Sequence, residues 1–245
     1  MIFRPFYYFD TGCAAYLFGC GSLGQCAVVD PQERDVDAYL SFAAEKGMKV
    51  THVFDTHVHA DHRSGGREIA RRTGAKYCLH RSAAVSFPFE PVEDGQKIPL
   101  GNTVVEVLHT PGHTSESISL VVGDLRRGPG PAPWFVCTGD TLFVGSIGRP
   151  DLPGQTEAQA AQLWDSVHEK LLGLPDAIEI FPAHFAGSAC GAGMSGKPSS
   201  TLAFEKSWNP MLSLDRDAFV RAMSEKVLAP PKGMDQMLAA NRGQV

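Results

Sequence analysis

The sequence predicts a layered α/β domain, and three observations support this fold class. The chain has 245 residues, 43% of them hydrophobic, which is enough to bury a substantial core. Short β-rich runs alternate with helical stretches that have a single apolar face. Four apolar runs end in histidine or aspartate, and ligand sites in α/β proteins form at the carboxyl ends of strands. We therefore expect residues 1–245 to form one domain.

Two strands and a helix are predicted first. The segments "AAYLFGC" and "CAVVD" have strand character, and the glycine-containing "GSLGQ" between them predicts a hairpin-like turn. Residues 33–46 then predict a helix that stops at Gly47. The apolar face of this helix, which should pack on a sheet, consists of Val36, Tyr39, Leu40, Ala43 and Ala44.

A second amphipathic helix is predicted over residues 157–172, with Thr156 as its N-cap. The proline- and glycine-rich segment 126–133 has strand-like sequence on both sides, so we interpret it as a loop inside the domain. The apolar face of the second helix consists of Ala160, Leu163, Trp164, Val167 and Leu171.

The carboxyl-terminal residues 200–245 predict a helical extension. One helix should end at Pro230 and Pro231, and a short final helix should follow. This extension could cover the mouth of an active site or a subunit interface, and we expect a homodimer. The apolar face of the first of these helices consists of Phe219, Val220, Met223 and Val227.

The composition excludes several classes of function. A net charge of −5 and a pI near 6.0 give no basic footprint for nucleic acid, so a small anionic substrate would need a local cluster of positive charge. No run approaches the roughly 18 apolar residues of a membrane span, and the amino terminus has no signal-peptide pattern. Six scattered cysteines without a CxxC pair predict reduced thiols and a cytoplasmic protein.

Metal-ligating side chains gather at the ends of the four apolar runs. If these ends converge, five histidines and two aspartates surround one pocket. Imidazole and carboxylate suit borderline divalent ions. The donors are His57, His59, Asp61 and His62 after "VTHVFDT", His113 after "TVVEVLHTPG", Asp140 after "WFVCTG", and His184 after "IEIFPA".

Spacing alone suggests a two-metal site. The first group would be His57, His59 and His113, and the second Asp61, His62 and His184, with Asp140 within reach of both. The other histidines are expected to be ordinary core or surface residues. They are His52, His80, His109 and His168.

The motifs "THVHADH", "TPGHTSES", "TGDTLF" and "PAH" occur in an order that resembles the metallo-β-lactamase superfamily. The resemblance covers residues 10 to about 190 and implies a four-layer αββα sandwich with the metal at one edge of the sheets. This superfamily contains hydrolases, oxygenases and oxidoreductases, so the fold alone does not decide the reaction.

Two longer segments narrow the resemblance to the persulfide dioxygenase branch, whose members are similar to the ethylmalonic encephalopathy protein. They are "HADHRSGG" together with "TGDTLFVGSIGRPDLPG", and residues 183–206, which are also similar to the dioxygenase domain of bacterial persulfide dioxygenase–rhodanese fusions. Glyoxalase II relatives have a Gly-His-Glu-Tyr motif at the last histidine, where this chain has Ala183, His184 and Phe185. That difference argues against a thioesterase.

The resemblance implies one Fe(II) per chain, held by the matching residues His57, His113 and Asp140, which would be the catalytic set. Two histidines and a carboxylate leave positions open for O2 and a substrate sulfur. The substrate would be glutathione persulfide or a similar small persulfide, oxidised to sulfite and the free thiol. The remaining donors would orient the ligands or hold a second metal; they are His59, Asp61, His62 and His184.

Anionic glutathione persulfide calls for cationic partners. Arg149 is the first candidate for a substrate-binding residue, with an ion pair to Asp151 as the alternative interpretation. Lys197 is the second candidate, with a solvated loop lysine as its alternative.

Three functions therefore remain open. The first is the iron persulfide dioxygenase, which we expect to obtain sulfur, if at all, from a separate rhodanese. The second is a glyoxalase II-like thioester hydrolase with one or two Zn(II) per chain. The third is a non-catalytic metal-binding sensor or partner subunit on the same fold.

Overall fold

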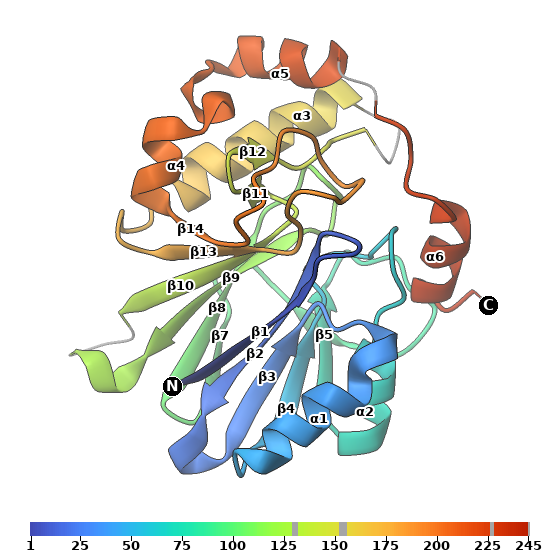
Figure 1. Ribbon diagram of the computed structural model, residues 1–245, viewed down its shortest axis with the longest axis vertical. Coiled ribbons are helices and arrows are strands. Elements are labelled where there is room, and N and C mark those ends of the chain that lie inside the picture. The colour runs from blue at the N-terminus through green and yellow to red at the C-terminus, as the bar shows by residue number, and fades with distance from the viewer. Residues whose placement is uncertain (129–131, 152–155, 226–227, 245) are drawn as a thin grey trace.

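The computed structural model describes residues 1–128, 132–151, 156–225 and 228–244. Two mixed six-stranded sheets lie face to face in these residues, and helices cover the outer face of each sheet (Figure 1). The predicted αββα sandwich is confirmed. None of the helices within the described ranges is long and apolar enough to cross a bilayer.

The first sheet is built from the amino-terminal third of the chain. Its strand order is β1-β2-β3-β4-β5-β6. The strands are β1 (Ile2–Tyr8), β2 (Cys13–Cys20), β3 (Gln25–Val29), β4 (Lys49–Phe54), β5 (Lys76–His80) and β6 (Glu90–Val92). Strands β2 and β3 form the predicted antiparallel hairpin, joined through a short 3-10 turn at Gly21–Leu23.

The second sheet has the strand order β14-β13-β10-β9-β8-β7. Strands β10 and β13 are parallel, while the other neighbours are antiparallel. A separate small hairpin joins β11 (Leu142–Phe143) to β12 (Ser146–Ile147). The strands of the sheet are β7 (Lys97–Leu100), β8 (Thr103–His109), β9 (Ile118–Asp124), β10 (Pro133–Gly139), β13 (Glu179–Pro182) and β14 (Ser200–Thr201).

Two helices cover the first sheet. They are α1 (Val36–Glu45), preceded by a 3-10 turn at Glu33–Asp35, and α2 (Gly66–Thr73). The predicted helix over 33–46 is confirmed, and Gly47 follows it with a left-handed φ of 64°. The predicted face was wrong at one position, because Ala44 is exposed while its neighbour Ala43 is buried.

The second sheet is covered by α3 (Thr156–Asp165), which continues as a π-helical turn (Ser166–Leu171), together with α4 (Leu202–Trp208) and α5 (Arg216–Glu225). The predicted helix over 157–172 is confirmed, although it includes Thr156 and does not begin after it. Another 3-10 turn joins α4 to α5 (Pro210–Ser213).

The carboxyl-terminal extension contains α4, α5 and a final helix, α6 (Met234–Asn241). Phe219 lies on the predicted apolar face of α5 and is fully buried in the cluster where α5 packs against α3, whereas Val227 lies outside the described residues. In Figure 1, α6 lies apart from α4 and α5, at the side of the sandwich where the loops after β4 and β5 run. Part of the predicted loop 126–133 also lies outside the described residues, and β10 already begins at Pro133.

The core has three apolar layers that match this architecture. The central layer contains Phe18 and Phe54 of the first sheet together with Leu120 and Phe135 of the second. One outer layer packs α1 and α2 on the first sheet, and the other packs α3 on the second sheet and α5 against α3. All six cysteines are buried and free of disulfides, as expected of reduced thiols. The sheets are therefore rigid on both faces, and the loops at their ends are held at fixed roots.

Candidate metal centre

The carboxyl ends of β4, β8, β10 and β13 bring the predicted donors together. The loop after β4 supplies four of them, and each of the other three strands supplies one. The Ala183 amide donates to the Gly139 carbonyl over 3.0 Å and ties the ends of β13 and β10. The Ile118 amide, which lies opposite the end of β8 at His109, donates to the Thr56 carbonyl after β4 over 2.8 Å. The predicted convergence of the four strand ends is confirmed.

Three buried side chains point at one position. The Nε2 atoms of His57 and His113 lie 3.9 and 3.4 Å from Oδ2 of Asp140. Among the described residues, neither His57 Nε2 nor Asp140 Oδ2 has a hydrogen-bond partner. Burial opposes ionisation of Asp140, but His184, His113 and His57 together lower the pKa of its carboxyl. Buried polar atoms without partners are rare in folded proteins, so this set fits a bound cation.

The other nitrogen of each imidazole is fixed by an outer partner. His113 Nδ1 lies 2.8 Å from the Arg149 carbonyl, which only accepts, so Nδ1 carries the proton and Nε2 keeps a lone pair. The Thr56 hydroxyl donates to Asp30 and lies 3.0 Å from His57 Nδ1, so it accepts the Nδ1 proton of His57. Burial lowers the pKa of His57 well below its usual range. Both rings are therefore held at Nδ1, and their Nε2 atoms are directed at the position they share.

Asp30 organises this side of the site, and sequence reasoning missed it. Its carboxylate accepts from the Thr56 amide (2.7 Å), from the Thr56 hydroxyl (3.0 Å) and from His59 Nε2 (3.1 Å). Asp30 also has a positive φ of 50°, a conformation that few non-glycine residues adopt and that clusters at functional sites. It is the last residue of the predicted strand "CAVVD", so the rule that identified the other donors would also have identified Asp30.

His59 lies beside this set. Its ring centre is 4.3 Å from that of His57, but its ligand atoms group with Asp30 and Asp55 and not with His113 and Asp140. Spacing alone suggested His57, His59 and His113 as the first group. The structure instead brings His57 and His113 together with Asp140. His59 Nδ1 remains buried without a partner among the described atoms.

The remaining donors form a hydrogen-bonded chain. Asp61 Oδ2 lies 3.0 Å from His184 Nε2, 3.1 Å from His62 Nδ1 and 3.3 Å from the Cys13 thiol. His184 Nδ1 lies 2.6 Å from Asp140 Oδ1. Burial alone would lower the pKa of His184, but the two carboxylates raise it well above its usual range. His184 thus holds Asp140 with Oδ2 turned toward His57 and His113.

Cys13 was not predicted to be near the site. An antiparallel bridge pairs it with His184, and the amide of Phe185 donates to the Gly12 carbonyl over 2.8 Å. The start of β2 and the end of β13 therefore run side by side, which places the Cys13 thiol next to Asp61. Spacing in the sequence carries no signal for this contact, because 48 positions separate the two residues.

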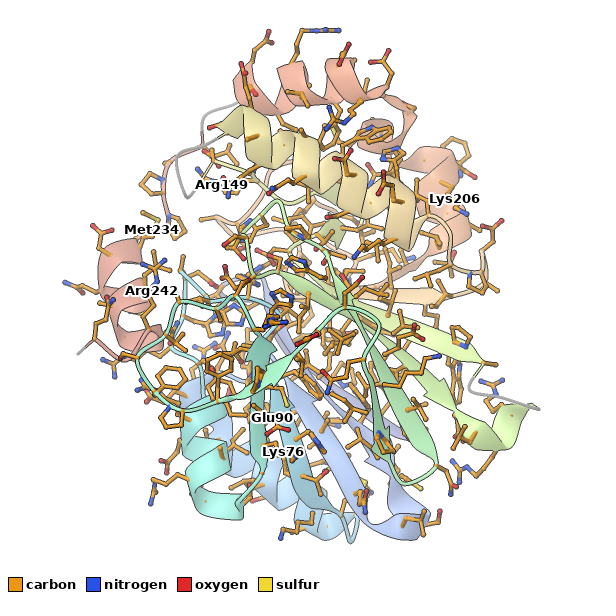
Figure 2. All side chains as sticks on the ribbon, turned by 180° about the vertical axis from the view of Figure 1, so that it is seen from behind. Lys76, Glu90, Arg149, Lys206, Met234 and Arg242 are labelled. Atoms are coloured by element: carbon orange, nitrogen blue, oxygen red, sulfur yellow. The ribbon has the colours of Figure 1, made fainter. Side chains whose placement is uncertain are left out.

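The two predicted substrate-binding cations differ in their surroundings. Arg149 is 4% exposed and forms a bidentate ion pair with Asp151, with both contacts at 2.6 Å. Its guanidinium also donates to the carbonyls of Ala189, Leu228 and Ala229, so its donors are committed to the protein. This geometry favours the alternative interpretation, in which Arg149 fixes the loop. Figure 2 labels this side chain below α3. Lys197 is exposed, and its role stays a prediction.

Two glycines in the site loops permit close backbone approach. A Cβ on Gly148 would lie 1.8 Å from the carbonyl oxygen of Asp140. Gly112 has a φ of 142°, and a Cβ there would lie 2.4 to 2.6 Å from atoms of Leu163. Larger residues would displace the loops that carry Asp140 and His113, so both positions require glycine.

The final helix is attached directly to the loop after β4. The side-chain nitrogen Nδ2 of Asn241 donates to the carbonyls of His59 and His62, both over 2.8 Å. Its side-chain oxygen Oδ1 accepts from the Ser64 amide over 3.0 Å. Asn241 is 7% exposed, so these bonds are protected from water. A single side chain from α6 therefore fixes three backbone groups of the loop after β4.

Replacing Asn241 with alanine should leave those three backbone groups without their partner. We expect the free energy of unfolding to fall by about 1–3 kcal/mol and the affinity for metal to fall roughly tenfold or more, because the loop loses its support. Thermal unfolding and metal titration measure the two effects. Gln236→Ala, at an exposed position on the same helix, is the matched control. Equal metal affinity in Asn241→Ala and the control would show that α6 does not position the loop.

Comparison with known proteins agrees with this geometry. The family described as the metallo-beta-lactamase superfamily matches residues 9–184, a span that contains all seven predicted donors. The chain belongs to this superfamily. Its relatives in the superfamily include the mitochondrial persulfide dioxygenase ETHE1 of Bos taurus, which is 29% identical over 92% of this chain and 82% of that protein.

Two further members of the superfamily are informative. The hydroxyacylglutathione hydrolase of Maricaulis maris is 31% identical, over 81% of each chain. The crystal structure of ETHE1 from Myxococcus xanthus superimposes with a TM-score of 0.86 at 34% identity, over 100% of this chain and 99% of that one. The chain is therefore an enzyme of the metallo-beta-lactamase superfamily with persulfide dioxygenase homologues, and its His and Asp clusters are able to hold a divalent metal. These relatives give no support to the non-catalytic sensor.

Proposed function

We propose that this enzyme is a persulfide dioxygenase that oxidises glutathione persulfide or a similar small persulfide. The terminal sulfur loses four electrons to O2, and with one water the products are sulfite, the free thiol and two protons. The persulfide dioxygenase relative aligned over 92% of the chain supports this substrate class. The observation that carries the proposal is the set of two histidines and one carboxylate that meet at one position.

We propose that His57, His113 and Asp140 hold one Fe(II), which would supply open coordination positions for O2 and the persulfide sulfur. The Nε2 atoms of the two histidines and Oδ2 of Asp140 are the atoms that would bind it. His184 orients the carboxylate, and the Arg149 carbonyl orients His113. Fixed outer partners of this kind raise metal affinity.

The other four predicted donors have supporting roles in this proposal. His59 is held by Asp30, while Asp61, His62 and His184 are held by one another. Together with Cys13 they form a second group able to hold a metal, in which Asp61 Oδ1 and His62 Nε2 have no partner among the described residues, so the metal count is the measurement that tests the one-metal proposal. We further propose that the enzyme is a cytoplasmic homodimer and that it receives persulfide from a separate rhodanese.

A glyoxalase II-like thioester hydrolase with one or two Zn(II) is the second candidate. The hydroxyacylglutathione hydrolase relative at 31% identity favours it, as does the complete set of seven donors. Hydrolysis needs a metal-bound water as nucleophile and no O2, so the two reactions differ in a directly measurable co-substrate.

Oxygen uptake distinguishes the two candidates. We expect protein loaded anaerobically with Fe(II) to consume about one O2 per glutathione persulfide and to release sulfite, whereas S-lactoylglutathione should not be hydrolysed. An oxygen electrode, a sulfite assay and thioester absorbance measure these outcomes in parallel. Thioester turnover without persulfide-dependent oxygen uptake would establish the hydrolase instead.

A further inference from the structure

The final helix also forms a wall of a cavity that reaches His113, one of the predicted metal donors. This cavity is lined by His113, Thr114 and Glu116 of the loop after β8, and by Leu238 and Arg242 of the segment that contains α6. Its volume is about 120 Å³. It therefore has room for one end of a small substrate next to a ligand of the proposed iron.

The backbone of Arg242 is held by hydrogen bonds, while its side chain is available to bind a ligand. Its carbonyl accepts from the Ser86 amide (2.8 Å) and the Ser86 hydroxyl (2.9 Å), and its neighbour Asn241 holds the loop after β4. The side chain is half-buried, and among the described residues its guanidinium has neither an ion pair nor a hydrogen bond. Figure 2 shows Arg242 at the end of the helix that begins at Met234.

The other arginines that line cavities around the site are occupied. Arg149 is saturated by Asp151 and three carbonyls. On the side of Asp61 and His62, Arg34 contacts Asp10 at 3.3 Å and Arg63 contacts Glu33 at 3.6 Å. Of the arginines that line these cavities, Arg242 is thus the one whose guanidinium has no carboxylate partner in the described structure.

The neighbouring acid does not neutralise it. Glu116 Oε1 accepts from the Val58 amide over 3.0 Å, and Oε2 accepts from the Ser115 hydroxyl over 3.2 Å. Both oxygens of Glu116 are therefore held by the wall of the cavity, and no contact within 4.0 Å joins Glu116 to Arg242 in the described structure. The guanidinium remains able to form a bidentate pair with an external carboxylate.

We infer that Arg242 is a specificity-determining residue that binds a carboxylate of the persulfide substrate while the sulfur end lies beside His113. The inference rests on the proposed function. The inference also agrees with the composition, because a protein with a net charge of −5 needs a local positive group to bind an anionic substrate. The preferred substrates are therefore small persulfides that carry a carboxylate, and neutral persulfides should bind more weakly.

Steady-state kinetics with two persulfides test this assignment. In Arg242→Gln, we expect the KM for glutathione persulfide to rise about tenfold or more, since a charge-assisted pair is lost, with kcat changed less than about twofold. The KM for 2-hydroxyethyl persulfide, which has no carboxylate, should stay the same. Arg242→Lys should recover part of the affinity for glutathione persulfide. Lys232→Gln, which removes an exposed positive charge just before α6, is the matched control and should change neither KM.

Calorimetric binding of glutathione separates this inference from the proposed function. We expect Arg242→Gln to weaken glutathione binding by a similar factor, whatever reaction the enzyme catalyses. If the wild type binds glutathione but oxidises no persulfide, the proposed function fails. The binding role of Arg242 is then still tested by comparing the glutathione affinities of the wild type and Arg242→Gln. Equal effects of Arg242→Gln on both persulfides, or no effect on glutathione binding, would overturn the inference.

Discussion

Replacing Asp140 with alanine should abolish turnover while leaving the fold largely intact. Asp140 is the carboxylate of the proposed iron site, and Oδ2 lies 3.4 and 3.9 Å from the Nε2 atoms of His113 and His57. We expect kcat/KM to fall by more than the roughly 10- to 100-fold loss that follows removal of an outer partner of a metal ligand. Oxygen uptake measures the activity, and circular dichroism with metal analysis separates loss of iron from loss of fold.

Two further variants sharpen this experiment. Asp140→Asn keeps the shape of the side chain and removes its charge, so it should also lose iron. Asp176→Ala removes a carboxylate that is 68% exposed and paired with Lys206 on the surface, and it should leave activity unchanged. If Asp140→Ala retains the activity of the Asp176→Ala control, the metal-centred mechanism is wrong.

Removing the metal should have an effect of similar size. We expect a chelator to abolish oxygen uptake and Fe(II) to restore it, whereas Zn(II) should bind without restoring it. Zinc has no accessible redox change, and the divalent affinity order places it above Fe(II), so zinc should compete for the site. Metal analysis of anaerobically purified protein should give one iron per chain, because the proposal assigns iron to the set His57, His113 and Asp140 alone.

The same measurement has an outcome that supports the alternative. Two metals per chain would mean that Asp61, His62 and His184 bind a second ion, and this result would favour the thioester hydrolase. Comparison of His62→Ala with the wild type refines the count. In a one-metal centre, His62→Ala should retain one iron per chain, since its Nδ1 contacts Asp61 and not the shared position.

Local patterns predicted most of the regular structure. The strands that carry the donors, the first hairpin and the helices over 36–45 and 156–171 were all predicted, because period and turn chemistry are properties of a short segment. Strands β1, β5, β6 and β7 and helix α2 were not predicted. The β1 segment contains Pro5, which lowers strand character, and the structure places β1 at the edge of the first sheet, where a proline is tolerated.

The candidate site was predicted less completely. Strand ends identified all seven donors, because donors at carboxyl ends are visible in one sequence. Contacts between distant segments were not visible, so Cys13 beside Asp61, Asn241 under the loop after β4 and Arg242 beside His113 emerged only from the fold. Arg149 was predicted to bind substrate, with an ion pair to Asp151 as the alternative, and only the fold shows that its guanidinium pairs with Asp151.

By itself, the sequence determined the elements, the donor types and their order, since these depend on neighbours within a few positions. The tertiary structure decided which donors share a position. His57 and His59 are two residues apart, yet Asp30 holds His59 to one side while Asp140, which lies 83 positions beyond His57, completes the site. The physical reason is that a metal site depends on distances of a few ångströms between side-chain atoms. Such distances are set by sheet register and by outer hydrogen bonds from segments far apart in the chain.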